Sequence, residues 1–181
     1  MGKMTTKRLC LVAVFAALYF VLTMYLTIRI GNITITLASL PILILAVLYG
    51  PLESTVAAAL GEFIHQLLSW GLTLTTPLWL LPPVVRGLIV AFGCMLIRRR
   101  CKVKEPWEQP AAFFALLVAA AVVTTLANTG ITWLDSVIFG YYSKAYVFGD
   151  FVIRLFTGIG TAVVLGFVIP PVVKALKRAG M

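Results

Sequence analysis

The sequence predicts an all-α integral membrane protein, a polytopic bundle of six transmembrane helices with both termini in the cytoplasm. Three observations lead to this fold class: the apolar composition, the lengths of the apolar segments, and the places where basic residues gather. The chain has 181 residues, of which 61% are hydrophobic and 12% charged, and its mean hydropathy is +1.04. Since soluble proteins are about half apolar and about a quarter charged, we expect lipid to be the main solvent.

Six apolar segments satisfy the requirements of a helical membrane bundle, because a helix needs about 20 apolar residues to cross the hydrocarbon core. The second segment is shorter, so we expect it to be tilted or partly buried by its neighbours. Gly50 and Pro51 end it, since proline lacks a backbone N–H and glycine tolerates turns. We expect one domain over residues 1–181, with helices at residues 9–28, 36–49, 52–70, 78–97, 111–133 and 151–176.

Three connections between these helices carry most of the remaining polar residues. A short polar connection begins at Arg29, a charged segment covers residues 98–109, and a longer loop covers residues 134–149. Pro106 and Pro110 mark the boundary before the fifth helix, because proline does not continue a preceding helix.

Basic residues gather at the N-terminus, after the fourth helix and at the C-terminus. The three clusters are Lys3, Lys7 and Arg8; Arg98, Arg99, Arg100, Lys102 and Lys104; and Lys174, Lys177 and Arg178. The opposite loops contain only Arg29 and Lys144, which is the positive-inside pattern of a protein with cytoplasmic termini. The net charge of +9 does not indicate nucleic-acid binding, because the basic residues punctuate apolar runs instead of forming a stripe along one face.

Ionisable residues within the expected helices lie at the depth of the outer leaflet. Such residues are costly in a membrane unless they are paired or hydrated, so each one is a functional hypothesis. Glu62, His65 and Gln66 have the spacing i, i+3 and i+4, which places them on one face of the third helix. Arg86 reaches a comparable depth in the fourth helix, because that helix runs in the opposite direction.

Further polar and aromatic residues are expected at the same depth. Asn128 and Arg154 come from the last two helices, Arg29 follows the first helix, and Thr76 and Trp79 lie near the start of the fourth. A cavity with this lining suits a flat heterocycle that carries an anionic group, since indoles stack on rings, amides and carboxylates bind ring edges, and arginines bind carboxylates. We therefore predict a substrate-binding site in the outer half.

Each of these residues also has a structural interpretation. Glu62 and Arg86 would pair with each other across two helices instead of contacting a ligand, Arg154 would extend to the outer headgroups, and His65 would bond a backbone carbonyl. The occurrence of acidic, basic, amide and aromatic groups at one depth favours a binding site over these separate roles.

Motifs for catalysis are absent from the sequence. It contains no G-x-x-x-x-G-K-[ST], H-E-x-x-H or G-x-S-x-G segment, so we expect no catalytic residues and no nucleotide hydrolysis. The single histidine also makes a metal site a poor hypothesis. Two alternatives stay open: an intramembrane enzyme that uses Glu62, His65 and Asp150 as acid–base groups, and a self-sufficient channel or proton-coupled carrier.

The whole chain resembles the S components of energy-coupling factor (ECF) transporters. The resemblance rests on the six-helix pattern, the basic termini, the small residues Ala13 and Ala17 four positions apart, and the stretch from Leu40 to Pro51. It implies a multi-pass protein of the bacterial plasma membrane that binds a vitamin from outside and associates with a transmembrane T component and two cytoplasmic ATPases. Ala13 and Ala17 would then face the T component.

Within this family the chain looks most like the folate-type S components. The matching segments are residues 27–30, 74–79, 86–87 and 127–129, and the surroundings of Arg154. This resemblance implies that Arg29, Arg86, Asn128 and Arg154 lie near the pterin and glutamate parts of folate. The chain would need no cofactor, and a bound vitamin would be the transported ligand. Pantothenate, riboflavin and a queuosine precursor stay open as other substrates.

Overall fold

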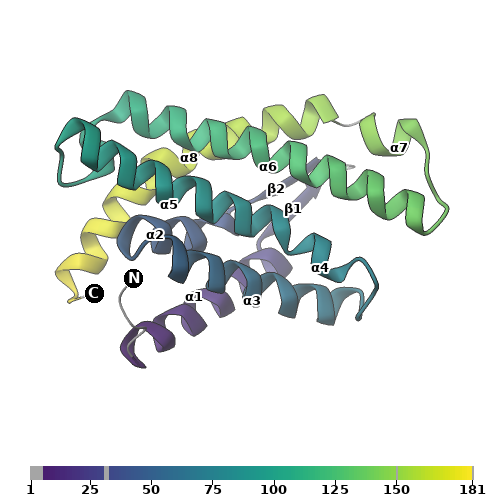
Figure 1. Ribbon diagram of the computed structural model, residues 1–181, viewed down its shortest axis with the longest axis horizontal. Helices are drawn as coiled ribbons and strands as arrows, with labels where there is room; N and C mark the ends of the chain where they lie inside the picture. The colour runs from purple at the N-terminus through teal and green to yellow at the C-terminus, as the bar shows by residue number, and fades with distance from the viewer. Residues whose placement is uncertain (1–5, 31–32, 150, 181) are drawn as a thin grey trace.

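The computed structural model describes residues 6–30, 33–149 and 151–180, without the side chains of residues 28–30 and 33–35. Within these ranges the chain is all-α apart from one hairpin, and six helices form the predicted bundle (Figure 1). They are α1 (Thr6–Tyr25), α2 (Ser39–Leu48), α3 (Pro51–Ser69), α5 (Leu81–Cys101), α6 (Pro110–Ile138) and α8 (Phe151–Arg178). The connections contain β1 (Thr27–Ile30), β2 (Ile33–Thr36), α4 (Thr76–Trp79), η1 (Pro106–Glu108) and α7 (Lys144–Phe148).

Four helical segments of the described chain are long and apolar enough to cross a membrane: Thr6–Tyr25, Thr76–Cys101, Pro110–Ile138 and Lys144–Arg178. The two remaining helices of the bundle differ for separate reasons. Helix α2 has only 10 residues, and α3 contains the polar residues Glu53, Glu62, His65 and Gln66. The described chain thus has four helical segments with the length and composition of membrane spans, together with the shorter α2 and the more polar α3.

Helix α2 lies in the middle of the bundle, where it contacts α1, α3, α5 and α8. Its residues Ile42 to Val47 are at most 4% exposed, as expected for a helix that is apolar on all sides. The expectation that neighbours bury this helix is therefore confirmed. At a rise of 1.5 Å per residue, α2 is about 15 Å long, whereas α6 is about 40 Å long. Helix α2 therefore fills only part of the length of the bundle.

The expected polar connection after α1 is a β-hairpin. Strands β1 and β2 pair antiparallel, with Thr27 opposite Thr36 and Ile30 opposite Ile33, and β2 contacts α8. The segments Thr-Ile-Arg-Ile and Ile-Thr-Ile-Thr alternate with a period of two and are rich in β-branched residues, which favours strands. The hairpin takes up Thr36, so α2 begins at Ser39 and not at residue 36 as expected.

Two other connections are shorter than the sequence suggested. Helix α6 continues to Ile138 because no glycine or proline lies between Trp133 and Gly140, and Gly140 has a φ of 75°. Helix α5 includes Arg98–Arg100 and ends at Cys101, since basic side chains in a last turn interact favourably with the helix dipole. The charged segment 98–109 and the loop 134–149 are therefore partly helical.

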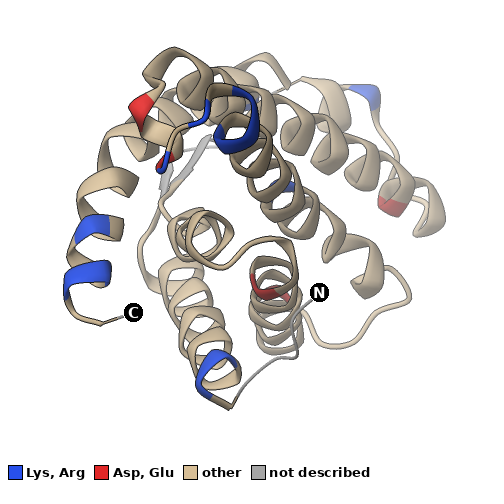
Figure 2. Ribbon diagram, turned by 60° about the vertical axis from the view of Figure 1, so that its left-hand side comes forward, with Lys and Arg blue, Asp and Glu red and all other residues tan. Residues whose placement is uncertain are grey.

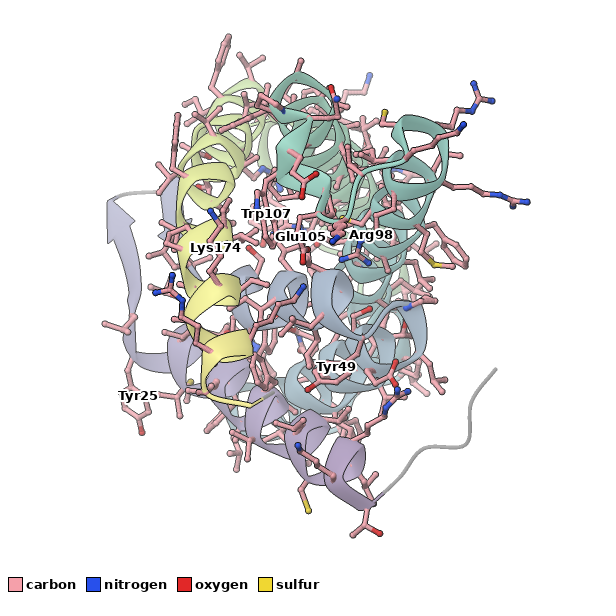
Figure 3. All side chains as sticks on the ribbon, turned by 90° about the vertical axis from the view of Figure 1, so that its left-hand side faces the viewer. Tyr25, Tyr49, Arg98, Glu105, Trp107 and Lys174 are labelled. Carbon is pink, nitrogen blue, oxygen red and sulfur yellow. The ribbon has the colours of Figure 1, made fainter. Side chains whose placement is uncertain are left out.

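Both ends of the described chain lie at the same end of the bundle (Figure 1). The Lys7 side chain donates a hydrogen bond to the Gly180 carbonyl over 3.2 Å, and Figure 2 shows most of the basic ribbon segments at this end. Here Glu105 accepts a hydrogen bond from Lys177, and its carboxylate lies 3.6 Å from the Arg98 guanidinium; Figure 3 labels Arg98 and Glu105. Arg98 also donates to the Val47 carbonyl over 2.7 Å, which places the C-terminal end of α2 at this end.

Gly61 allows α1 and α3 to pack closely at the middle of the bundle. A Cβ atom at this position would lie 2.7 Å from Cδ1 of Tyr19 and 2.9 Å from the backbone oxygen of Ala16. A backbone oxygen has no rotamer that relieves such a contact, so any side chain at position 61 separates the two helices.

We expect the substitution Gly61→Ala to destabilise the protein by about 1–3 kcal/mol, the usual effect of overpacking. The thermal midpoint of the detergent-solubilised protein, followed by size-exclusion chromatography after heating, measures this loss. The control Gly160→Ala lies on α8 with nothing within 4 Å of the added Cβ, so its midpoint should stay equal or rise slightly. Equal midpoints for the two variants would contradict close packing at Gly61.

Candidate ligand-binding site

A cavity of about 670 Å³ occupies the half of the bundle that α2 does not fill. This volume lies within the range of about 300–1,000 Å³ that is typical of small-molecule sites. Residues Ser39, Ile42 and Leu43 of α2 form part of its lining, and α3, α5, α6 and α8 supply most of the walls. The cavity lies toward the end of α3 that leads into α4, away from the chain termini.

Most of the predicted site residues meet in this cavity. Two of them do not: Thr76 is buried outside its lining, and the side chain of Arg29 lies outside the described residues. The hydroxyl of Thr76 accepts a hydrogen bond from the Thr73 N–H over 2.9 Å, so it holds the turn before α4, and Thr73 and Thr75 line the cavity in its place. The predicted residues that line the cavity are Glu62, His65, Gln66, Trp79, Arg86, Asn128 and Arg154.

Glu62 is the centre of a hydrogen-bond cluster between α1 and α3. Its carboxylate accepts hydrogen bonds from the Tyr19 hydroxyl over 2.5 Å and from Nε2 of Gln66 over 2.7 Å, and Nδ1 of His65 lies 3.3 Å from Oε1. The spacing i, i+3 and i+4 thus places the three α3 residues together, as predicted. Glu62 is 7% exposed, and these partners compensate for its burial.

Arg86 extends from α5 into the cavity without a carboxylate partner among the described residues. Its Nε donates to the Thr124 hydroxyl over 3.3 Å, and the Thr124 hydroxyl donates to the Ala120 carbonyl over 2.6 Å. The ion pairs within the described part of the chain do not include Glu62 with Arg86. The guanidinium therefore keeps its terminal nitrogens for other acceptors, and such a fork binds planar oxygen pairs well.

Residues at the ends of α6 and α8, together with Tyr146 of α7, line the part of the cavity farthest from the chain termini. Arg154 donates to the Val147 carbonyl over 2.7 Å and so joins α8 to α7, while its buried Nε has no hydrogen-bond partner in the described structure. The Tyr141 hydroxyl donates to Asp135. Burial, this hydrogen bond and the negative charge of Asp135 raise the pKa of Tyr141.

Sequence reasoning missed several polar residues of the lining, among them Tyr19, Ser39, Thr124 and Asp135. Tyr19, Ser39 and Thr124 lie within apolar or small-residue runs, where a single hydroxyl gives no distinct signal. Asp135 was expected in a loop, but the continuation of α6 to Ile138 brings it into the cavity wall. Its position could have been found from the lack of a helix-breaking residue between Trp133 and Gly140.

The predicted partner-contact residues of α1 lie on the opposite side of that helix from the core. Ala13 and Ala17 are exposed, whereas Val12, Phe15, Ala16 and Tyr19 are buried. Helix α1 therefore has one face that packs inside the bundle and another that its own described neighbours do not cover.

The lining has groups that can bind a polar, partly aromatic guest. The described residues contain no group of three or more His, Cys, Asp or Glu side chains placed to hold a metal ion. The aromatic side chain of Trp79, the guanidinium of Arg86 and the amide of Asn128 supply stacking, charge and hydrogen bonds.

Comparisons with known proteins agree with this architecture. The family model described as the ECF-type riboflavin transporter S component matches residues 3–178. A solved structure described as the S component of a bacterial ECF transporter superposes with a TM-score of 0.52 and 21% sequence identity, over 96% of this chain and 94% of that chain. Comparison with curated proteins gives no match. The chain therefore belongs to the family of ECF-type S components, and its fold is that of a solved member.

Proposed function

We propose that this chain is the high-affinity, vitamin-binding subunit of an ECF-type importer. The observation that carries the proposal is the cavity of about 670 Å³ with charged and polar side chains in its lining, within an otherwise apolar bundle. Ionisable groups in a membrane are tolerated where they pair or face a polar cavity, and they commonly mark a substrate site. Arg86 is the clearest example, because only its Nε takes part in a hydrogen bond within the described residues.

Folate is our first candidate for the ligand. Its glutamate part carries two carboxylates, for which Arg86 and Arg154 of the cavity lining are suitable partners. Its pterin ring is flat and has hydrogen-bonding edges, which suit the amide of Asn128 and the Glu62 cluster, and Trp79 supplies a stacking surface.

Riboflavin is the second candidate, and a specific observation favours it. The family model that matches nearly the whole chain is the riboflavin-type model. Riboflavin is also a flat heterocycle, but its tail carries hydroxyls instead of carboxylates. Glu62 and Asp135 line the cavity, and carboxylates accept hydrogen bonds from such hydroxyls.

We further propose that the end with the chain termini faces the cytoplasm and that the cavity faces outward. The basic clusters of this end support the orientation by the positive-inside rule. A T component and two cytoplasmic ATPases would then supply the energy for release, since the sequence has no nucleotide-binding motif of its own. The exposed Ala13 and Ala17 on α1 are suited to close packing against a helix of the T component.

The purified protein should bind one vitamin per chain in the absence of ATP. Titration with folate and with riboflavin, followed by quenching of tryptophan or flavin fluorescence, identifies the ligand. Tighter binding of folate supports the first candidate, and tighter binding of riboflavin supports the second. Failure to bind either compound, in a protein that keeps its helix content by circular dichroism, would contradict both assignments.

Arg86→Ala should weaken vitamin binding by at least about 30-fold, because removal of one member of a buried charged contact usually costs about 2–5 kcal/mol. Arg86→Lys should restore part of the affinity. The control Arg99→Ala removes an exposed arginine from the other end of the same helix and should leave the affinity unchanged. Wild-type affinity in Arg86→Ala would remove this residue from the site.

The double substitution of Ala13 and Ala17 by leucine should block vitamin uptake and spare vitamin binding. Bulky side chains prevent the close approach that small residues permit between membrane helices. Uptake of radiolabelled vitamin by cells that also produce the T component and ATPases measures the first effect, and titration of the purified chain measures the second. Val164→Phe adds bulk at an exposed position of α8 as a control. Normal uptake by the double variant would show that this face does not contact the partner.

A further inference from the structure

The N-terminal end of α2 has an unsatisfied hydroxyl at the cavity. Ser39 is the first residue of α2, it lines the cavity, and it is 5% exposed. Its Oγ is buried and has no hydrogen-bond partner among the residues that the structure describes. Buried hydroxyls usually have a partner, so an exception calls for a specific explanation.

The orientation of α2 makes this end of the helix suitable for an acceptor atom. Its C-terminal end lies with the chain termini, where Arg98 bonds the Val47 carbonyl, so its N-terminal end faces the hollow half of the bundle. The residue at the N-cap position is Ala38, whose side chain makes no capping hydrogen bond. The Ala38 N–H donates to the Thr36 hydroxyl, the Leu40 N–H donates to the Leu37 carbonyl, and Pro41 has no N–H. This end therefore offers an acceptor the Ser39 hydroxyl and the partial positive charge of a helix N-terminus.

The part of the cavity that lies deeper in the bundle is otherwise apolar. Leu43 of α2, Val90 of α5, Leu117 of α6 and Leu165 of α8 belong to the lining. Val90 lies four residues beyond Arg86 along α5, or about 6 Å deeper at 1.5 Å per residue. Ile42 of α2 lies against Gly87 of α5, so Ser39, one turn before Ile42, lies at the boundary of this apolar part, at about the depth of Arg86.

We propose that Ser39 and the N-terminal end of α2 form a subsite that donates a hydrogen bond to a carbonyl oxygen on the ring of the bound vitamin. Pterin and isoalloxazine rings both carry such a carbonyl within a cyclic amide, so the subsite suits both candidate ligands. This inference rests on the proposed function and adds a contact for the ring of the ligand.

The test is the substitution Ser39→Ala, with Ser54→Ala as the matched control. Ser54 is also fully buried, but its hydroxyl donates to backbone carbonyls of Gly50 and Pro51 and it does not line the cavity. Each protein is titrated with the vitamin that the wild type binds and with the corresponding ring alone, lumiflavin for riboflavin or 6-methylpterin for folate. The thermal midpoint of each ligand-free protein is measured in parallel.

Ser39→Ala should weaken binding of the vitamin and of the ring alone by the same factor, about tenfold. Its ligand-free midpoint should equal or exceed that of the wild type, because the substitution removes a hydroxyl without a partner. Ser54→Ala should keep the wild-type affinity. A merely structural role for Ser39 would lower the ligand-free midpoint instead.

Unchanged affinity of Ser39→Ala, or a loss seen with the vitamin and not with the ring alone, would overturn the subsite and leave the proposed function intact. A wild-type protein that binds neither vitamin would contradict the proposed function, and this inference with it. The two failures are thus distinguished by the wild-type titration.

Discussion

The short length of α2 is the constraint on which the cavity depends. The ten residues of α2, nine of them apolar, fill the middle of the bundle at the end that holds the chain termini, and the surrounding helices are two to three times as long. The remaining length is hollow because no central helix fills it. Membrane helices gain little from burying apolar surface against one another, since lipid is equally apolar, so polar groups can line this space where neighbours satisfy them.

The polar groups in the hollow half are held in different ways, and the differences suggest separate roles. Tyr19, His65 and Gln66 surround Glu62, which fixes the orientation of its carboxylate. Arg86 is held through Nε alone, so a ligand can be bound without breaking a strong contact within the protein. The Glu62 carboxylate is thus held in place before a ligand arrives, and the Arg86 guanidinium keeps N–H donors for it. Such a preorganised site loses little conformational entropy on binding.

The sequence predicted the six-helix bundle well because long apolar runs and basic clusters are collective signals. It also placed Glu62, His65 and Gln66 on one face, since helical spacing needs only local geometry. The hairpin at β1 and β2 was missed because its alternation covers only four residues per strand. The roles of Tyr19 and Ser39 could not be predicted, since they depend on which distant helices lie opposite each hydroxyl.

Native mass spectrometry of the purified chain, incubated with a mixture of vitamins and released from detergent, tests the central claim most directly. The account predicts a single bound vitamin of flat heterocyclic type per chain in the wild type, and loss of that mass in Arg86→Ala. Retention of the same vitamin by both proteins, or a wild-type chain that carries no vitamin from the mixture, would contradict it.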